Sequence, residues 1–361
     1  MGWHRQLLAF AGLPCAVGAQ SAIRSCLIFV ATMFTRILLA NCVVGLILAD
    51  PVLDRFWSKD QQAQLLANTK IYHMHEVSSV SEPIPAPAGE TYRPTVVAHG
   101  MGDSGTNPGM KSLCKTVSDK YPGAFVLCST TADSGKSISM TFDKQLADFQ
   151  AEIASHPELK NGFNAVGLSQ GNFLLEAYIA LVNDPPVYNF VSICGPLQGE
   201  ATCPSNIAFD LICPVWKLDP YGAPLAFSSY WKGTKDKDTY LAKSRMLADV
   251  LNEKDTKNAT VANNFKALNS MMMIEATEDT MIEPKESEQY GMWDWGTSGK
   301  KAPIVALRDS EGYKGDFIGL QTLDKAGKLH SSQFVGEHIR FNNSYWDSVV
   351  LPYFNNYLPT M

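Results

Sequence analysis

Six short apolar runs, separated by stretches of helical periodicity, are the feature that most limits how this chain can fold. The runs span residues 95–98, 124–128, 165–168, 190–194, 271–274 and 304–307. Each has the length and character of a buried strand. Between them, a core-facing helical stripe is formed by Phe142, Leu146, Phe149 and Ile153. Alternating strands and helices predict an α/β fold with a mostly parallel sheet and helices on its faces.

The sequence divides into three segments of different composition. Residues 1–49 contain an apolar targeting segment, residues 50–92 are polar and then Pro-rich, and residues 93–361 carry the strands and helices. We expect the middle segment to be extended. The rhythm breaks at about residues 198–268, where Pro, Lys and Asp cluster, and this stretch is predicted to be an insertion between two late strands.

The apolar segment at 26–49 has two interpretations, a cleaved signal peptide or a signal anchor. A membrane-spanning helix over these residues would place Arg36 near the bilayer centre, at a cost of about 2.5–3.5 kcal/mol. The uninterrupted apolar runs on either side of Arg36 are also too short to span a bilayer alone. Cleavage is therefore favoured, and either interpretation sends the body into the secretory pathway.

Five cysteines remain once the leader is removed, an odd number for an oxidising compartment. Two bridges and one free thiol fit best. The candidate bridges are Cys203 with Cys213 and Cys114 with Cys128. Cys194, inside an apolar run, is then an inert core thiol. Since no Cys-x-x-Cys occurs, we expect no metal.

Charge and surface motifs restrict the partners. Lys and Arg number 30 against 36 Asp and Glu, which gives a formal charge of -6. Without a basic excess to neutralise phosphates, nucleic acid is not expected as a partner, and no obligatory protein partner is inferred. Asn-x-Ser/Thr triplets make Asn258 and Asn342 glycosylation candidates, in agreement with secretion.

The pentapeptide Gly167-Leu-Ser-Gln-Gly171 joins a predicted strand to a predicted helix. This is the setting of a nucleophile elbow, with Ser169 as the nucleophile. A glycine-rich loop at residues 99–105 follows another strand, and the backbone N–H groups of Met101 and Gln170 could together form an oxyanion hole. The same loop matches the G-x-G-x-x-G of a dinucleotide-binding turn, but Pro108 lies where the helix should run.

A serine nucleophile needs a base and an acid. His330 and His338 alone follow Ser169 in the chain, and His338 is preferred because it precedes a possible closing helix, whereas His330 lies in a Lys-rich stretch. The acid should follow the strand at 271–274. Spacing does not choose among the four available residues, which are Glu275, Glu278, Asp279 and Glu283.

Several motifs in the same order resemble the palmitoyl-protein thioesterases, lysosomal enzymes of the α/β-hydrolase fold. They are His99-Gly-Met-Gly-Asp-Ser104, Gly167-Leu-Ser-Gln-Gly171, Gly195-Pro-Leu-Gln-Gly199, Cys203-Pro204, Tyr230-Trp231 and Gly336-Glu-His338. The resemblance, from about residue 94 to 353, implies a Ser-Asp-His triad that carries over to Ser169 and His338. It places Glu283 at the acid position, where the family has aspartate.

The expected activity is hydrolysis of long-chain fatty acyl (palmitoyl) thioesters, with S-acylated proteins or peptides and acyl-CoA as substrates and no cofactor. Aromatic residues of the insertion, among them Tyr230 and Trp231, are candidates for the wall of an acyl groove. Two alternatives keep every motif: a lysosomal esterase or lipase, and an acyl-CoA thioesterase of shorter chain preference. A third, a non-catalytic secreted lipid-binding relative with a decayed site, is left open because the acid position departs from the family.

Overall fold

The described part of the chain folds around a parallel sheet, here in a computed structural model. It comprises residues 73–77, 80–204, 213, 216–217, 219–223 and 225–359. The sheet has the order β2-β1-β3-β4-β5-β8, and all neighbouring strands run parallel. Its strands are β1 (Thr95–Ala98), β2 (Val126–Cys128), β3 (Phe163–Leu168), β4 (Val187–Ile193), β5 (Ser270–Ala276) and β8 (Leu329–Phe334). The predicted targeting segment at 1–49 lies outside the described residues.

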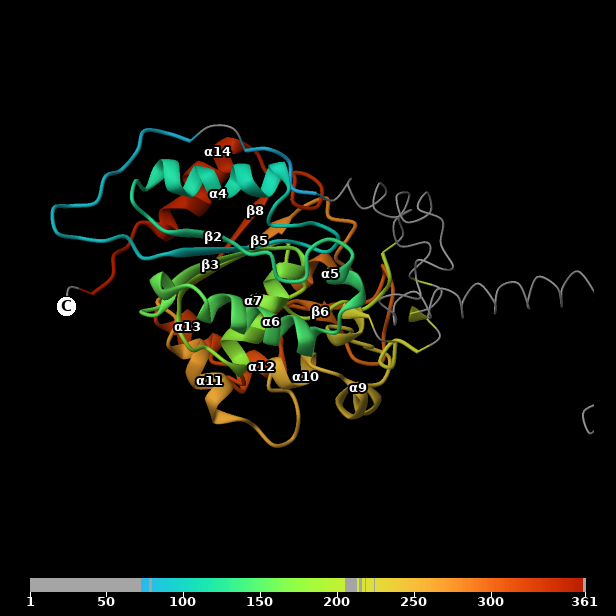
Figure 1. Cartoon of the computed structure of the whole chain (residues 1–361). Coiled ribbons are helices and arrows are strands. Elements are labelled where there is room, and N and C mark those ends of the chain that lie inside the picture. The colour runs from blue at the N-terminus through green and yellow to red at the C-terminus, as the bar shows by residue number, and fades with distance from the viewer. Residues whose placement is uncertain are drawn as a thin grey trace, which may run out of the picture.

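Helices cover both faces of this sheet (Figure 1). On one face lie α4 (Pro108–Lys120), α14 (Asn343–Tyr345), η6 (Trp346–Val350) and η7 (Leu351–Phe354). The other face is covered by α6 (Phe142–Ala154), α7 (Gln170–Leu181), α10 (Leu247–Val250), α11 (Ala259–Lys266) and α13 (Leu320–Lys325). Shorter elements complete the described chain: α5 (Lys136–Ser139), α9 (Lys237–Lys243), α12 (Glu311–Lys314), η2 (Pro157–Leu159), η3 (Ala226–Ser229), η4 (Lys285–Gln289) and η5 (Leu307–Asp309).

Each strand sends alternate side chains into two separate cores. In β3, Ala165 belongs to the core beneath α6 and α7, whereas Val166 belongs to the core beneath α4. The predicted helical stripe is confirmed, because all four of its residues are buried along α6. The aromatic residues of the predicted insertion, Phe227 and Trp216 among them, join the α6/α7 core. They therefore pack on the sheet's own helices and do not form a separate core.

One predicted strand is misplaced. Residues 304–307 do not join the parallel sheet; Ile304 and Val305 form β7, which pairs antiparallel with β6 (Met292–Trp293). The sixth strand of the main sheet is β8, at its edge, and most of its residues face solvent or are half-buried. An edge strand needs no continuous apolar run, so the search for apolar runs missed it.

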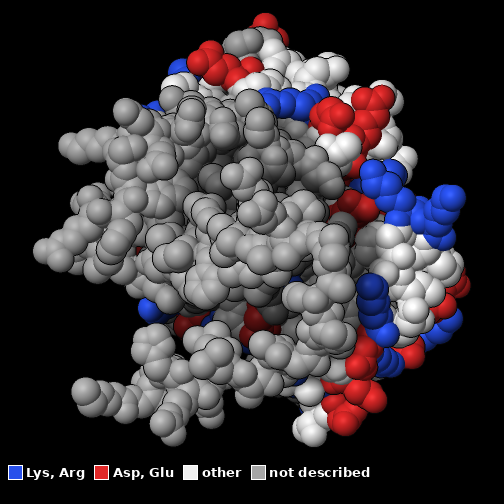
Figure 2. Space-filling model, turned by 90° about the vertical axis from the view of Figure 1, so that its right-hand side faces the viewer, with Lys and Arg blue, Asp and Glu red and all other residues white. Residues whose placement is uncertain are grey.

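The described N-terminal residues lie along the body without forming helices or paired strands, apart from a single bridge between Tyr92 and Tyr357. Met74 N–H donates to Asp103 Oδ2 at 2.8 Å, and Ile84 N–H donates to Lys120 O at 2.8 Å. This segment thus braces the loop after β1 and the end of α4. No helix among the described residues is long and apolar enough to span a membrane. On the face in Figure 2, the described acidic and basic side chains are interspersed.

Both predicted disulfides are present, Cys114–Cys128 with Cα atoms 6.0 Å apart and Cys203–Cys213 with Cα atoms 5.8 Å apart. The first ties α4 to β2, and the second closes a short loop in the predicted insertion. Cys194 is free and buried, as predicted.

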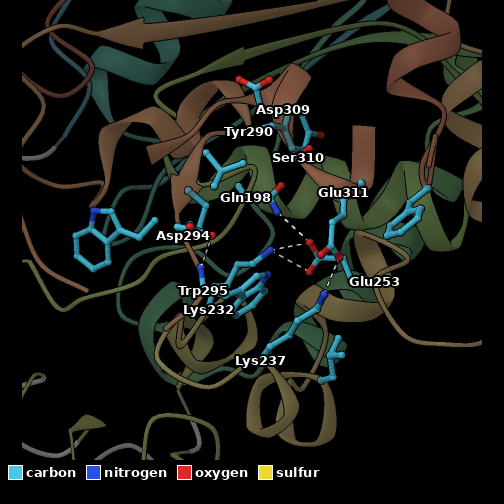
Figure 3. A pocket seen from close by; sticks show the side chains of 16 residues that line it. Gln198, Lys232, Lys237, Glu253, Tyr290, Asp294, Trp295, Asp309, Ser310 and Glu311 are labelled. Carbon is cyan, nitrogen blue, oxygen red and sulfur yellow. Dashed lines mark hydrogen bonds and ion pairs between the residues drawn. The ribbon is translucent and has the colours of Figure 1, made fainter. Parts of the chain in front are cut away.

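A pocket of about 270 Å³ opens beside α9 and β6, and a buried ion pair lies within it. Lys232 Nζ donates to both carboxylate oxygens of Glu253, at 2.7 and 2.9 Å, and Gln198 Nε2 donates to the same carboxylate at 3.0 Å (Figure 3). Tyr240 adds a further hydrogen bond at 2.6 Å. Because these groups satisfy one another, the pocket presents no unpaired charge of this pair to a ligand.

Breaking this pair should destabilise the fold. Lys232→Met is expected to lower the free energy of unfolding by about 2–3 kcal/mol, less than for a fully enclosed pair, because Glu253 would lose its cation while its side chain stays only 15% exposed. The matched control is Lys254→Met, which removes the exposed pair with Asp249 and should cost at most about 1 kcal/mol. Denaturant unfolding of both variants measures the difference. Equal losses would show that the Lys232 pair contributes no more than a surface pair.

Candidate active site

Ser169 stands at a strained turn between β3 and α7. Its backbone φ is 54° and ψ is −127°, a conformation that L residues rarely adopt and that is typical of functional sites. The flanking glycines are required by close packing. A Cβ at Gly167 would lie 2.4 Å from Asn172 Oδ1, and one at Gly171 would lie 2.6 Å from the carbonyl oxygens of Ala98 and His99. The half-buried Ser169 is therefore presented at the carboxyl end of β3, as an elbow requires.

The loop after β1 lies directly against the nucleophile. A Cβ at Gly100 would be 3.0 Å from the Cβ of Ser169, so only a bare backbone fits there. Met101, a predicted oxyanion donor, is the next residue, and Gln170 opens α7, where the first N–H groups have no partner within the helix. Gly102 N–H donates to Ser137 Oγ at 2.7 Å, which anchors the loop. The oxyanion role of Met101 and Gln170 stays a prediction.

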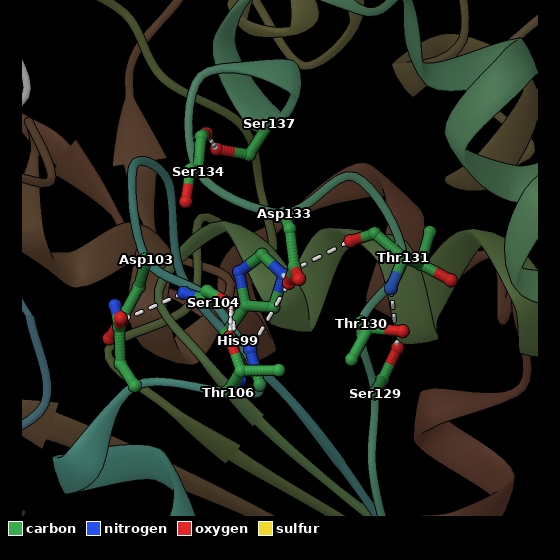
Figure 4. Close-up of polar contacts among 12 residues, drawn as sticks. His99, Asp103, Ser104, Thr106, Ser129, Thr130, Thr131, Asp133, Ser134 and Ser137 are labelled. Atoms are coloured by element: carbon green, nitrogen blue, oxygen red, sulfur yellow. Dashed lines mark hydrogen bonds and ion pairs between the residues drawn. The ribbon is translucent and has the colours of Figure 1, made fainter.

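His99 is buried behind this loop and carries a charge partner. Its Nδ1 lies 2.8 Å from Gly100 O, and its Nε2 lies 3.0 Å from Thr131 O and 3.3 Å from Asp133 Oδ1 (Figure 4). A neutral imidazole has one N–H, so two acceptor sites favour the imidazolium. Burial alone would lower the pKa of His99, but the hydrogen bonds to Asp133 and Gly100 outweigh it and raise that pKa.

This raised pKa predicts a pH-dependent contribution to stability. It is complete below the pKa of unfolded histidine, about 6.5, and is lost as the pH rises through the folded pKa. His99→Gln should therefore destabilise the protein more at about pH 5 than at about pH 9. Unfolding free energies of wild type and variant at both pH values measure this. A difference that does not shrink with rising pH would contradict the buried imidazolium.

The structure pairs His338 with Asp279. Both follow neighbouring strands: Asp279 comes after β5, and His338 comes after β8. Their loops are joined by the hydrogen bond from Glu278 N–H to Gly336 O at 3.0 Å. His338 Nδ1 lies 2.5 Å from Asp279 Oδ2, and both side chains are buried. The other histidine candidate, His330, is exposed on β8.

Asp279 is fixed as an anion. Its Oδ1 accepts the N–H groups of Met281 at 2.6 Å and Ile282 at 3.0 Å. Burial alone would raise the pKa of Asp279, but the charge and hydrogen bond of His338 lower it below its ordinary value. A carboxylate at Nδ1 directs the other ring nitrogen, Nε2, to act as the base.

Glu283, the predicted acid, is not the carboxylate that the structure pairs with His338; Asp279 holds that place. Glu283 lies beyond the turn that the Met281 and Ile282 amides close around Asp279. Its backbone is tied elsewhere, with its N–H donating to Glu200 Oε1 at 2.8 Å and its C=O accepting from Ala201 N–H at 2.9 Å. The loop thus turns towards residues 200–201 after Asp279, and the aspartate reaches the histidine.

One strand end connects the serine and histidine regions. Ser169 N–H donates to Ile193 O at 3.0 Å. The next residue, Cys194, accepts the N–H of Ile339 on its Sγ at 3.4 Å, and Ile339 follows His338. The loops carrying nucleophile and histidine therefore both contact the end of β4.

The predicted groove residues lie close to the elbow but are buried. Tyr230 OH donates to Gln170 Oε1 at 2.9 Å, and its ring contacts Phe142 and Phe173. Trp231 packs edge to face on Trp216, with ring centroids 4.2 Å apart. Tyr230 thus holds the side chain next to Ser169, and the acyl-groove role of both residues stays a prediction.

Sequence reasoning missed two side chains beside the triad candidates, Cys194 as a neighbour of His338 and Glu288 in η4. Together with Asp279 and His338 they are the one group of potential metal ligands that the described residues bring together. Burial raises the pKa of the Cys194 thiol and of the Glu288 carboxyl well above ordinary values. A cation would have to displace protons from both. The absence of a metal stays a prediction.

This chain is similar to proteins of one known family. The family described as palmitoyl protein thioesterase has a sequence model that matches residues 94–338. Palmitoyl-protein thioesterase 3 of Dictyostelium discoideum is 31% identical over 73% of this chain and 93% of its own length. Palmitoyl-protein thioesterase 1 of Caenorhabditis elegans is 31% identical over 70% of this chain and 88% of its own length. The human protein named lysosomal thioesterase PPT2 is 25% identical over 68% of this chain and 81% of its own length.

Proposed function

Since this chain belongs to the palmitoyl protein thioesterase family and is a serine hydrolase of the α/β-hydrolase fold, we propose that it removes long fatty acyl chains from cysteines of proteins or peptides. The observation that carries this proposal is the buried His338–Asp279 pair, 2.5 Å apart, at the same edge of the sheet as the Ser169 elbow. The same chemistry would accept acyl-CoA, because it too is a thioester.

The proposed reaction begins with attack of Ser169 Oγ on the thioester carbonyl. His338 takes the serine proton on Nε2, while its Nδ1–H donates to Asp279, which stabilises the imidazolium. The N–H groups of Met101 and Gln170 receive the developing oxyanion. The tetrahedral intermediate collapses with loss of the thiolate, which receives the proton from His338. Water, activated by His338, then hydrolyses the acyl-enzyme and restores the serine.

The leaving group changes which step is demanding. A cysteine thiol has a pKa of about 8.5 and leaves far more easily than an amine. The acylation step therefore needs less assistance than in a protease, and hydrolysis of the serine ester becomes at least as demanding. We expect acyl-enzyme to accumulate on Ser169 during turnover.

The test compares substrates that differ in one property at a time. An S-palmitoyl peptide, the same peptide with an S-acetyl group, palmitoyl-CoA and an O-palmitoyl serine peptide are assayed with Ser169→Ala as the blank. We expect the highest kcat/KM for the palmitoyl thioesters. A higher value for the oxygen ester would indicate an esterase or lipase instead, and a higher value for the acetyl group would indicate a short-chain thioesterase.

We also propose a lysosomal or secretory location, with glycans on Asn258 and Asn342. Relatives carry the name lysosomal thioesterase, and both asparagines are exposed at helix starts. In each, the side-chain oxygen caps the helix, at 2.9 Å from Thr260 N and 2.8 Å from Tyr345 N. Glycosidase treatment of protein from a secreting cell line should lower its mass. Unmodified Asn258 and Asn342 peptides would reject the glycans.

A further inference from the structure

Four buried groups meet behind the catalytic histidine. One ligand atom from each of Cys194, Asp279, Glu288 and His338 lies within 4.8 Å of the other three. All four residues are buried, and Glu288 has no exposed surface. Cys194 and Glu288 have no step in the proposed mechanism. The carboxyl groups of Asp279 and Glu288 lie so close together in a dry interior that they should not both be ionised.

The hydrogen bonds decide which carboxyl keeps the proton. Asp279 accepts from His338 and from two backbone N–H groups. Glu288 accepts one backbone hydrogen bond, from Ala276 N–H to Oε2 at 3.0 Å. Its buried Oε1 accepts no hydrogen bond from the described protein atoms. Donors stabilise a carboxylate, so the charge belongs on Asp279 and the proton on Glu288.

We propose that Glu288 is a positioning residue of the catalytic site, a carboxylic acid that keeps its proton and directs it at Asp279. The inference rests on the proposed function, which gives Asp279 and His338 their roles. Ligand atoms of Glu288 and Asp279 lie within 4.8 Å of each other, and at this separation the acid holds the carboxylate that orients the His338 ring, without touching the substrate.

The surroundings of Glu288 agree with a retained proton. Burial, followed by the charge of Asp279, raises its pKa well above the ordinary value. Of the other facing groups, Cys194 is a neutral thiol whose pKa burial also raises. Glu275 is paired with Lys285 at 2.7 Å, so that cation is already engaged. His338 is engaged by Asp279.

The retained proton has a consequence for the base. A second carboxylate beside the ring would favour the imidazolium and would remove the free base at acidic pH. With Glu288 neutral, one negative charge, that of Asp279, faces the His338 ring. The acid limb of the kcat/KM profile therefore depends on the protonation state of Glu288.

The first experiment compares Glu288→Gln with Glu288→Met, and Glu176→Gln serves as the control. Glutamine is neutral and can donate to Asp279; methionine has similar length and cannot. Glu176 is also fully buried, with its pKa raised by burial, but its carboxyl bonds Tyr290 OH at 2.5 Å. We expect Glu288→Gln and the control to keep the wild-type acid limb, and Glu288→Met to lower kcat at least about tenfold with little change in KM.

A downward shift of the acid limb by about one unit or more in Glu288→Gln would show that Glu288 is ionised and overturn the proposal. Wild-type kcat in Glu288→Met would equally overturn it. The proposed function is judged separately, by whether wild type hydrolyses palmitoyl thioester and labels Ser169 with a phosphonate.

A second measurement needs neither activity nor the methionine variant. The infrared difference spectrum of wild type minus Glu288→Gln should contain a protonated carboxyl band that persists at about pH 8, well above the ordinary pKa of glutamate. A carboxylate band in its place would overturn the proposal even if the enzyme proved to act on other substrates.

Discussion

Ser169→Ala is expected to lower palmitoyl-thioester turnover by about a millionfold, the scale on which removal of a serine nucleophile acts in other hydrolases. Ser169 carries the one hydroxyl of the Gly167–Gly171 elbow, and the neighbouring residues Leu168 and Gln170 are buried. Without that oxygen no acyl-enzyme forms. Turnover is measured as thiol release from an S-palmitoyl peptide, and labelling as the mass shift of the Ser169 peptide after treatment with a lipid phosphonate.

Folding serves as the control for this variant, and the backbone offers a matched pair. At φ 54° alanine keeps the strain of the turn, whereas glycine relieves it. Ser169→Gly should therefore be as inactive as Ser169→Ala and should melt at the same or a higher temperature. Residual turnover well above the blank in both variants, with intact melting transitions, would show that another group is the nucleophile.

The sequence predicts most of the sheet because its inner strands are buried on both faces. β1, β3, β4 and β5 read as apolar runs, since neither face meets water. The edge strand β8 is missed for the opposite reason: its centre carries His330 and Ser331 on exposed surface. Apolar pattern thus predicts where a strand is enclosed, not where a sheet ends.

The site is predictable in so far as it depends on local backbone. The glycines around Ser169 are sequence signals for the close approach that the structure contains. Glu288 gives no such signal. Its burial beside Asp279 depends on how the loop after β5 turns back towards the end of that strand. This turn brings the Glu288 carboxyl to the N–H of Ala276, twelve residues earlier in the sequence. Long-range placement of this kind follows from tertiary packing and leaves no local pattern.

The dependence on tertiary packing also explains why the resemblance selected Glu283, whereas the structure pairs Asp279 with His338. Resemblance counted positions along the loop from Pro284, but the residue that meets His338 is set by distance from the strand end. Asp279 is three residues beyond Ala276, the last residue of β5, and the hydrogen bond of Thr277 N–H to Phe334 O keeps the two loops together there. Four residues further on, the backbone of Glu283 is bonded to Glu200 and Ala201.

Asp279→Asn should therefore cut turnover by up to about ten-thousandfold, as loss of the orienting carboxylate does in serine proteases. An amide at this position can donate to His338 Nδ1, which favours the tautomer with its proton on Nε2 and removes the base. Glu283→Gln is the matched control: it makes the same carboxylate-to-amide change on the same loop. We expect near-normal turnover from it, because its backbone contacts survive the substitution.

The pH profile distinguishes this tautomer effect from a general loosening of the loop. Contact with His338 lowers the pKa of Asp279, so its carboxylate stays ionised under mildly acidic conditions. In Asp279→Asn the imidazole loses its carboxylate partner, so the shape of the pH–rate profile should change, whereas a loosened loop would lower the rate by a similar factor at every pH. An inactive Glu283→Gln beside an active Asp279→Asn, both with wild-type melting temperatures, would return the acid to Glu283 and require the loop after β5 to rearrange before it can act.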